Sequence, residues 1–575
     1  MNSLTLAVVS CGTLYLGYLL YARLIARLWD FDPDRPTPAT ERPDGVDYVP
    51  ARHWTMLFGH HFASIAGVAP VVGPVLACAA WGWLPTLLWV VIGAIFLGAV
   101  HDFSSLMASL RARGRSIADL AEAHLGHRVR IVFGGFLWLT LILVVAVFAR
   151  FGAMTLTDEP RVVIPTFGII VVAVLVGLMM YRWRVPQWLA TLSGVALLGA
   201  LIVAGYHLPI QLPWADREAA LHLGLGSLTF LDATLNANLL AWTVILLVYA
   251  YLASITPVNL LLQPRDYLAT FVLYIGLLAG YIGLILTRPA VQAPPMVSFS
   301  TAQGYLWPML FVVVACGAIS GFHSLVASGT TAKQIGREAD APRIGYGAMI
   351  VEAALAVLAI VAVTAGLRWD SGPSPLLDVL KKEGAPGPLI VFANGFAALT
   401  EPIFRDPSLG VLVAITVLKT FIMTTLDSAT RITRYLGEEL FGEGLGIKAL
   451  SNRFLATAII IALACYLSLG SWQKVWPVFG SANQLIAALA LLVLTVVLWR
   501  RKKCVLYTLI PFAFMLATTL GALVVNAWSF LHTGKVALAI VSAALLGLAV
   551  VMVVDSLRVV FRGKRGAAPG GTAGE

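Results

Sequence analysis

Charged residues are scarce in this sequence of 575 residues. Asp, Glu, Lys and Arg make up 12% of the chain, while 59% of the residues are hydrophobic. A soluble protein carries about 25% charged residues, so this composition excludes a soluble globular class. The apolar runs are continuous rather than alternating, and helices satisfy every backbone polar group inside a bilayer. The sequence therefore predicts an all-α polytopic membrane protein, with the lipid bilayer as its first partner.

Cysteines and catalytic motifs are sparse as well. The five cysteines are scattered and no C-x-x-C pair occurs, so neither a disulfide framework nor a zinc knuckle is indicated. The sequence holds no G-x-S-x-G, Walker A or H-E-x-x-H motif. We therefore expect a protein that is not an enzyme and needs no cofactor. The net charge of +10 is explained by basic loops at a membrane surface, and no nucleic acid is expected as a partner.

The apolar runs define about fifteen predicted transmembrane helices, which start near residues 4, 56, 81, 130, 162, 187, 239, 268, 306, 344, 408, 454, 475, 506 and 536. Lys and Arg gather in alternate loops, including the run "RRKK" at 500–503. The positive-inside rule then places the N-terminus outside and the C-terminus in the cytoplasm. If the apolar segment 389–404 also crossed the membrane, every later loop would change sides and the run "RRKK" would lie outside. We therefore predict that this segment is a helix on the outer face.

This topology divides the chain into six parts. They are a first transmembrane helix with a cytoplasmic acidic loop (1–50), a first helical repeat (51–210), two intervening helices with loops (211–300), a second helical repeat (301–500), a C-terminal helix pair (501–562) and a disordered tail (563–575). The second repeat carries the outer-face helix 389–404.

One histidine motif occurs twice within predicted spans. Gly59-x-His61-x5-Gly67, in "FGHHFASIAGVAPVVGP", recurs as Gly321-x-His323-x5-Gly329. The two spans cross in opposite directions by our count, and glycine-interrupted helices of opposite direction are typical of inverted-repeat transporters. We predict that both helices unwind near the bilayer midplane and hold substrate. The predicted substrate-binding residues are Gly59, His60, His61, Ser64, Gly67, Gly321, His323, Ser324, Ser328 and Gly329. The alternative is that the histidines tie helices together through backbone hydrogen bonds.

Other ionisable residues also fall inside predicted spans, where each normally faces a cavity or a partner. The candidates for proton or cation coupling are His101, Asp102, Lys419, Thr424, Asp427 and Ser428, and Glu352 lies in a further span. Structural alternatives remain for each: His101 and Asp102 could bridge helices, Lys419 could extend to a polar surface, and Asp427 could neutralise Arg431. Arg265 and Asp266 are interpreted as a salt bridge on the loop side.

Several strings resemble the carbon starvation protein A (CstA) family, which includes bacterial pyruvate permeases. They are "FGHHFASIAGVAPVVGPVLA", "GAVHDF", "LLLQPRDYL", "CGAISGFHSLVASGTTAKQ" and "TTLDSATRITRY". The resemblance implies a secondary transporter of the cytoplasmic (inner) membrane with an inverted-repeat core similar to the amino acid–polyamine–cation (LeuT-like) superfamily. It also implies uptake of peptides, or of pyruvate with protons.

The resemblance assigns elements of that core to this chain. It implies broken helices at Gly59–Gly73 and Ser320–Thr331, an eighth core helix that ends at Asp427–Ser428, and an outer gate helix at 389–404. Two spans, near 239 and 268, exceed a plan of two five-helix repeats.

We therefore expect a secondary transporter that imports a small carboxylate such as pyruvate, or short peptides, with the proton as coupling ion. Two alternatives use the histidines differently. His61, His101 and His323 could ligate b-type haem in a redox subunit, or the His and Asp cluster could carry a metal ion. The sequence leaves the choice of substrate and the oligomeric state open.

Overall fold

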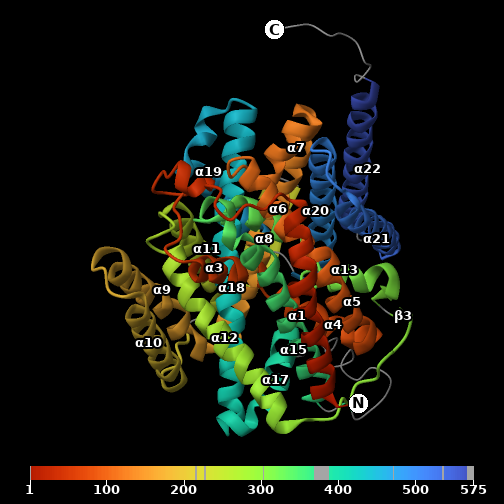
Figure 1. Ribbon diagram of the computed structural model, residues 1–575. Helices are drawn as coiled ribbons and strands as arrows, with labels where there is room; N and C mark the ends of the chain where they lie inside the picture. Colours follow the sequence, from red (N-terminus) through yellow and green to blue (C-terminus); the bar gives the residue numbers. More distant parts are fainter. Residues whose placement is uncertain are drawn as a thin grey trace.

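The computed structural model describes residues 2–213, 217–225, 228–301, 303–367, 369, 387–469, 472–533 and 536–565 (Figure 1). The helices are α1 (Ser3–Leu28), α2 (Pro38–Glu41), α3 (Trp54–Ala66), α4 (Ala69–Trp81), α5 (Trp83–Gly93), α6 (Ala99–Arg111), α7 (Ile117–Leu125), α8 (His127–Asp158), α9 (Val163–Gly177), α10 (Gln187–His207), α11 (Ala237–Ile255), α12 (Leu262–Thr287), α13 (Phe311–Val313), α14 (Gly321–Gly329), α15 (Gly347–Ala365), α17 (Pro388–Phe404), α18 (Pro407–Gly437), α19 (Arg453–Ser468), α20 (Trp472–Arg500), α21 (Leu506–His532) and α22 (Val536–Arg565). The predicted tail lies outside the described residues from 566 onward, and α22 reaches Arg565.

The helical membrane class predicted from composition is confirmed. In the described part of the chain, thirteen helical segments are long and apolar enough to cross a membrane. The apolar helices α17 and α19 are shorter than these. The predicted total of fifteen crossings and the orientation in the bilayer stay predictions.

Two short pairs of strands, one within 211–300 and one just after it, depart from the expected all-helical pattern. Strand β1 (Glu218–Leu225) pairs antiparallel with β2 (Leu228–Asn236), and a smaller pair joins β3 (Ser300–Thr301) to β4 (Gly304–Tyr305). The first hairpin has a sequence-level reason, because leucines at 221, 223 and 225 alternate with other residues in the two-residue period of a strand. The prediction for this region, two helices with loops, did not include the hairpin.

Helix α3 occupies the centre of the molecule. It packs against α12, α14, α15 and α18, and Figure 1 shows these helices gathered around it. The apolar segment Trp54–Trp81, which includes α3 and α4, is 94% buried over its most apolar part, whereas the corresponding parts of α1 and α10 are 28% and 22% buried. Residues on α3 are therefore surrounded by protein rather than by lipid.

Candidate functional site

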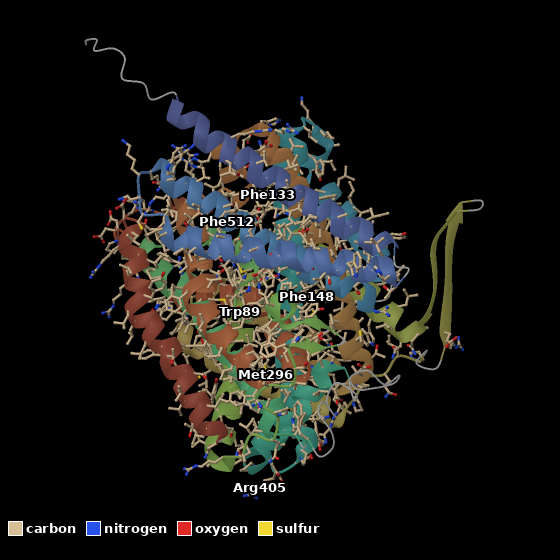
Figure 2. All side chains as sticks on the ribbon, turned by 90° about the vertical axis from the view of Figure 1, so that its right-hand side faces the viewer. Trp89, Phe133, Phe148, Met296, Arg405 and Phe512 are labelled. Carbon is tan, nitrogen blue, oxygen red and sulfur yellow. The ribbon has the colours of Figure 1, made fainter. Side chains whose placement is uncertain are left out.

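The first predicted helix interruption is present at Gly67. Helix α3 ends at Ala66, Gly67 has φ +52° and ψ −146°, and α4 begins at Ala69. This backbone conformation is essentially restricted to glycine. A Cβ atom on Gly67 would also lie 3.0 Å from the ring of Phe148, which Figure 2 labels, and 3.3 Å from Thr425 Oγ1. Pro70 then lies in the first turn of α4, where its missing N–H leaves no intrahelical bond unmade.

The second interruption lies between α13, which ends at Val313, and α14, which begins at Gly321. The first backbone N–H groups of α14 are partly occupied, since Phe322 N donates to Asn483 Oδ1 at 2.9 Å. Asn483 Nδ2 also donates to Ser320 Oγ at 3.0 Å. The Asn483 side chain of α20 therefore caps the N-terminus of α14.

The two copies of the histidine motif do not occupy equivalent positions. The first copy, Gly59–Gly67, comes before its break and lies on α3, whereas the second, Gly321–Gly329, follows its break and forms α14. The break in the second helix therefore precedes the segment Ser320–Thr331 that the resemblance assigned to it. The half-helices α3 and α14 pack directly against each other, so the repeated motif brings two histidine-bearing segments together.

A first buried cluster, the Asp102 cluster, consists of His101, Asp102, His323 and Glu352. Asp102 Oδ1 lies 2.9 Å from His101 Nδ1, and Asp102 Oδ2 lies 2.9 Å from His323 Nδ1. His323 Nε2 faces Glu352 Oε2 at 3.5 Å. All four side chains are fully buried. Within the described residues, His101 Nε2 and both Glu352 oxygens make no hydrogen bond. Helices α6, α14 and α15 thus enclose ionisable groups whose hydrogen-bonding capacity is incompletely used.

A second buried cluster, the Arg265 cluster, consists of His60, Tyr249, Arg265, Asp266 and Asp427. The Arg265 guanidinium pairs with Asp427 and donates to Asp266 Oδ1 at 2.7 Å, while Tyr249 donates to Asp427 Oδ2 at 2.7 Å. His60 Nδ1 lies 2.6 Å from Asp266 Oδ2.

The predicted salt bridge between Arg265 and Asp266 is present, but its predicted location in a loop was wrong. Both side chains are buried because α12 begins at Leu262, several residues before the predicted span. The alternative partner for Asp427 was wrong as well, since Asp427 pairs with Arg265 and Arg431 pairs with Asp47.

The adjacent histidines of α3 contact the residues that follow α14, and His60 also belongs to the Arg265 cluster. His60 Nδ1 faces Asp266, whereas His61 Nδ1 lies 2.8 Å from Thr331 Oγ1. His60 Nε2 in turn lies 3.3 Å from Thr330 Oγ1. Neighbouring residues in a helix point about 100° apart, so one helix presents a histidine to each side. Two consecutive threonines at the end of α14 therefore contact two consecutive histidines of α3, and these are side-chain contacts rather than the backbone ties of the alternative interpretation.

Lys419 is buried in the protein rather than extended to a polar surface. Its side chain is 1% exposed, and its ammonium donates to the carbonyl of Gly152 on α8 at 2.7 Å. A small cavity of about 20 Å³ lies beside it, lined by Arg265, Thr166, Thr416 and Thr420 among other residues. This cavity therefore meets two cationic side chains and three hydroxyl groups.

The remaining predicted residues fall into two groups. Ser64 and Ser428 contact each other across α3 and α18, with 2.7 Å between their hydroxyl oxygens, and Thr424 accepts a hydrogen bond from Arg265 at 2.8 Å. Ser324 and Ser328 donate to carbonyls of their own helix, to Gly321 and Ser324 respectively, at 2.7 Å.

Three predicted glycines serve close packing in this structure. A side chain on Gly59 would collide with Thr270, one on Gly321 with Asn483, and one on Gly329 would lie 3.2 Å from Ile432. These residues let α3 and α14 approach α12, α20 and α18, and their assignment to substrate binding stays a prediction.

A third network, in the last two turns of α18, was missed from the sequence. Asp47 lies in the segment between α2 and α3, and its Oδ1 accepts hydrogen bonds from Arg431 at 2.8 Å, Arg434 at 3.1 Å and Tyr435 at 2.6 Å. Burial raises the pKa of the Asp47 carboxyl, but the positive charges of Arg434 and Arg431 outweigh burial and hold that pKa below its ordinary value. The chain before α3 is therefore tied to the end of α18.

Nothing in the sequence marked the residues that complete these networks. Tyr249 is one aromatic residue among many in an apolar run, and Asp47 follows an acidic loop that gave no chemical signal. Within the described residues, no group of three or more His, Cys, Asp or Glu side chains is placed to hold a metal ion.

Comparison with known proteins gives consistent similarities. A profile of the family described as "Carbon starvation protein CstA" matches residues 2–368 and 379–522. The pyruvate/proton symporter BtsT of Escherichia coli is 32% identical, over 91% of this chain and 81% of that protein. The peptide transporter CstA of Bacillus subtilis is 32% identical, over 90% of this chain and 89% of that protein. The peptide transporter CstA of Escherichia coli is also 32% identical, over 91% and 81%.

Among solved structures, a manganese transporter of Eremococcus coleocola has a similar fold. The TM-score is 0.50 at 11% identity, and the match covers 90% of this chain and 99% of that chain. This similarity supports the predicted LeuT-like architecture with interrupted helices. It carries no information on substrate.

Proposed function

This chain belongs to the carbon starvation protein family, and we propose that it imports a small carboxylate, pyruvate or a short peptide, by proton symport. Membership of this family identifies the chain as a multi-pass membrane transporter and not as an enzyme. The inner membrane is the location expected for such a transporter in bacteria. The named relatives, which transport peptides or pyruvate with protons, do not favour the haem and metal-ion alternatives.

One observation carries the proposal of proton coupling: of two adjacent histidines on an interrupted helix, His60 contacts a buried carboxylate, and His61 contacts the segment that follows α14. His60 is 2.6 Å from Asp266, and His61 lies on the side of α3 where α14 carries His323. Ionisable residues buried at membrane depth mark ion and proton pathways. Histidine is the side chain that most often carries protons in proteins, and this general chemistry makes His60 and His61 the candidates for coupling.

The buried cations support a carboxylate as the shared feature of the substrate. Pyruvate and the C-terminus of a peptide both carry this group. Arg265 and Lys419 line the same cavity, and a guanidinium matches the geometry of a carboxylate. The cavity of about 20 Å³ is too small for substrate in this state, since ligand sites typically occupy roughly 300–1,000 Å³. Substrate entry therefore requires α9 and α18 to separate, as alternating access demands.

Uptake by purified protein in proteoliposomes tests this function. We expect radiolabelled pyruvate or a dipeptide to accumulate when the outside is more acidic than the lumen, and a protonophore to abolish accumulation. Cross-competition between the two compounds identifies the substrate. Uptake that ignores the pH gradient would remove proton coupling while leaving transport intact.

Histidine variants connect the assay to the site. We expect His60→Gln and His61→Gln to lose accumulation driven by the pH gradient, because glutamine cannot change its charge. His207→Gln is the matched control, since His207 is exposed at the end of α10. Full gradient-driven uptake in both α3 variants would refute the assignment of coupling to these histidines.

A further inference from the structure

A large apolar groove lies on the lipid-facing side of the molecule, and none of its lining residues belongs to the clusters described above. Its volume is about 830 Å³, and it is lined by α1, α5 with the residues Phe96 and Leu97 that follow it, Phe311 of α13, and α21 with Cys504 before it. Several lining side chains are large, apolar and exposed, among them Leu88, Ile92, Phe96 and Ile510. Figure 2 faces this region, with α1 in red at the left, α21 in blue, and Trp89 labelled below α21.

Polar groups gather at one end of this otherwise apolar groove. Cys504, Leu506 and Tyr507 line it where α21 begins, and Leu28 lines it where α1 ends. The Tyr507 side chain is 8% exposed, and its hydroxyl has no hydrogen-bond partner within the described residues. Its hydroxyl is thus a buried polar group without a partner at this end of the groove.

Positive charge is concentrated at the same end. Arg500, Arg501, Lys502 and Lys503 are exposed and directly precede Cys504. Lys503 Nζ pairs with Asp30 Oδ1 at 2.7 Å, which fastens the basic run to the end of α1. In the described part of the chain, no ion pair involves Arg500, Arg501 or Lys502. Partial burial and the nearby positive charge of Arg111 lower the pKa of Arg501. The site therefore has uncompensated positive charge.

We propose that this groove binds one anionic phospholipid of the surrounding bilayer, with an acyl chain along α1, α5 and α21 and its phosphate at Arg500–Lys503. A run of four basic residues directly beside a transmembrane helix is typical of anionic-lipid recognition. The volume lies within the roughly 300–1,000 Å³ of sites that bind small ligands. The basic loop and the unpaired tyrosine select for the anionic headgroup, and the apolar groove accepts the chain.

The floor of the groove connects the lipid to the second helix interruption. Trp89 is 5% exposed and packs against Phe311 and Phe514, with ring centroids 4.7 and 5.6 Å apart. Its indole N–H donates to the carbonyl of Val314, directly after α13, at 3.1 Å. A lipid that fills the groove packs against the same aromatic group that holds this break, so occupancy stabilises the native state.

Native mass spectrometry of the full chain tests the proposal independently of transport. Delipidated protein is titrated with phosphatidylglycerol or with phosphatidylethanolamine of the same chains. We expect one tightly held phosphatidylglycerol per chain and a higher Tm with that lipid alone. Equal retention of both lipids, or no retention of either, overturns the proposal.

Two variants separate the parts of the site. Ile92→Trp fills the groove, and the triple variant R500Q/R501Q/K502Q removes charge outside the helices without changing the packed core. We expect each to reduce phosphatidylglycerol retention at least tenfold. The matched controls are Val171→Trp, an exposed lipid-facing position on α9, and R182Q/R184Q, another basic loop. Retention unchanged in the triple variant, or lost equally in its basic-loop control, refutes headgroup recognition. A dimer formed through this face in place of lipid also refutes it.

Discussion

Substitution of Gly67 by alanine tests whether the interruption between α3 and α4 is built into the backbone. Gly67 has φ +52° and ψ −146°, a region where a residue with a Cβ atom costs of order 1–3 kcal/mol. The new Cβ atom would also lie 3.0 Å from the Phe148 ring, so the ring must shift by a few tenths of an ångström. We therefore expect Gly67→Ala to destabilise the protein by about 2–3 kcal/mol, and a difference of that size changes a conformational equilibrium roughly 30- to 150-fold.

Thermal unfolding in detergent, combined with uptake in proteoliposomes, measures both effects. Gly135→Ala is the matched control, because Gly135 lies inside α8 and a Cβ atom there meets no atom within 4 Å. Adding Phe148→Leu to Gly67→Ala removes the ring contact but not the backbone cost, so we expect only partial recovery. Stability and uptake of Gly67→Ala equal to those of the control would refute the requirement for glycine.

Three further results are expected. Asp427→Asn leaves the buried Arg265 charge partly uncompensated and destabilises the protein by about 3–5 kcal/mol, whereas Asp555→Asn removes an exposed pair and costs less than about 1 kcal/mol in the same unfolding assay. Lys419→Met preserves the apolar volume of the side chain, so stability changes by less than about 1.5 kcal/mol. It removes the buried cation, so we expect carboxylate uptake to be abolished. Normal uptake by this variant contradicts the proposed role of Lys419. The pKa of Asp47 is lowered by its arginine partners, so its stabilising effect is present above about pH 4 and is lost as pH falls through the lower folded-state value. The difference in stability between wild type and Asp47→Asn is therefore constant from pH 5 to 8, and a change within that window would show that another group titrates with it.

The sequence predicted the features that depend on local chemistry. Low charge and long apolar runs were sufficient for the membrane-helix class, and the glycine and proline residues around Gly67 marked a helix interruption. The hairpin β1–β2 was missed because it lies between strongly apolar segments that dominated the interpretation.

The pairings of the candidate site could not be predicted in the same way. Arg265 meets Asp427 across 162 positions of the chain, and Asp102 meets His323 across 221. Such contacts depend on which helix faces pack together, and a single sequence does not specify this. The span was predicted to start near residue 268, whereas α12 starts at Leu262. Arg265 was therefore assigned to a loop. Proline is tolerated in the first turn of a helix. Pro264 was therefore the one local signal that α12 starts before residue 268.

The adjacent placement of His60 and His61 has a mechanical consequence. Both imidazoles belong to one short rigid segment, so a rotation of that segment about its axis displaces them together. A movement that lengthens the contact with Asp266 also changes the contact with Thr331. A change in the position of this segment on one side therefore changes its contacts on the other, without any chain of hydrogen bonds between them.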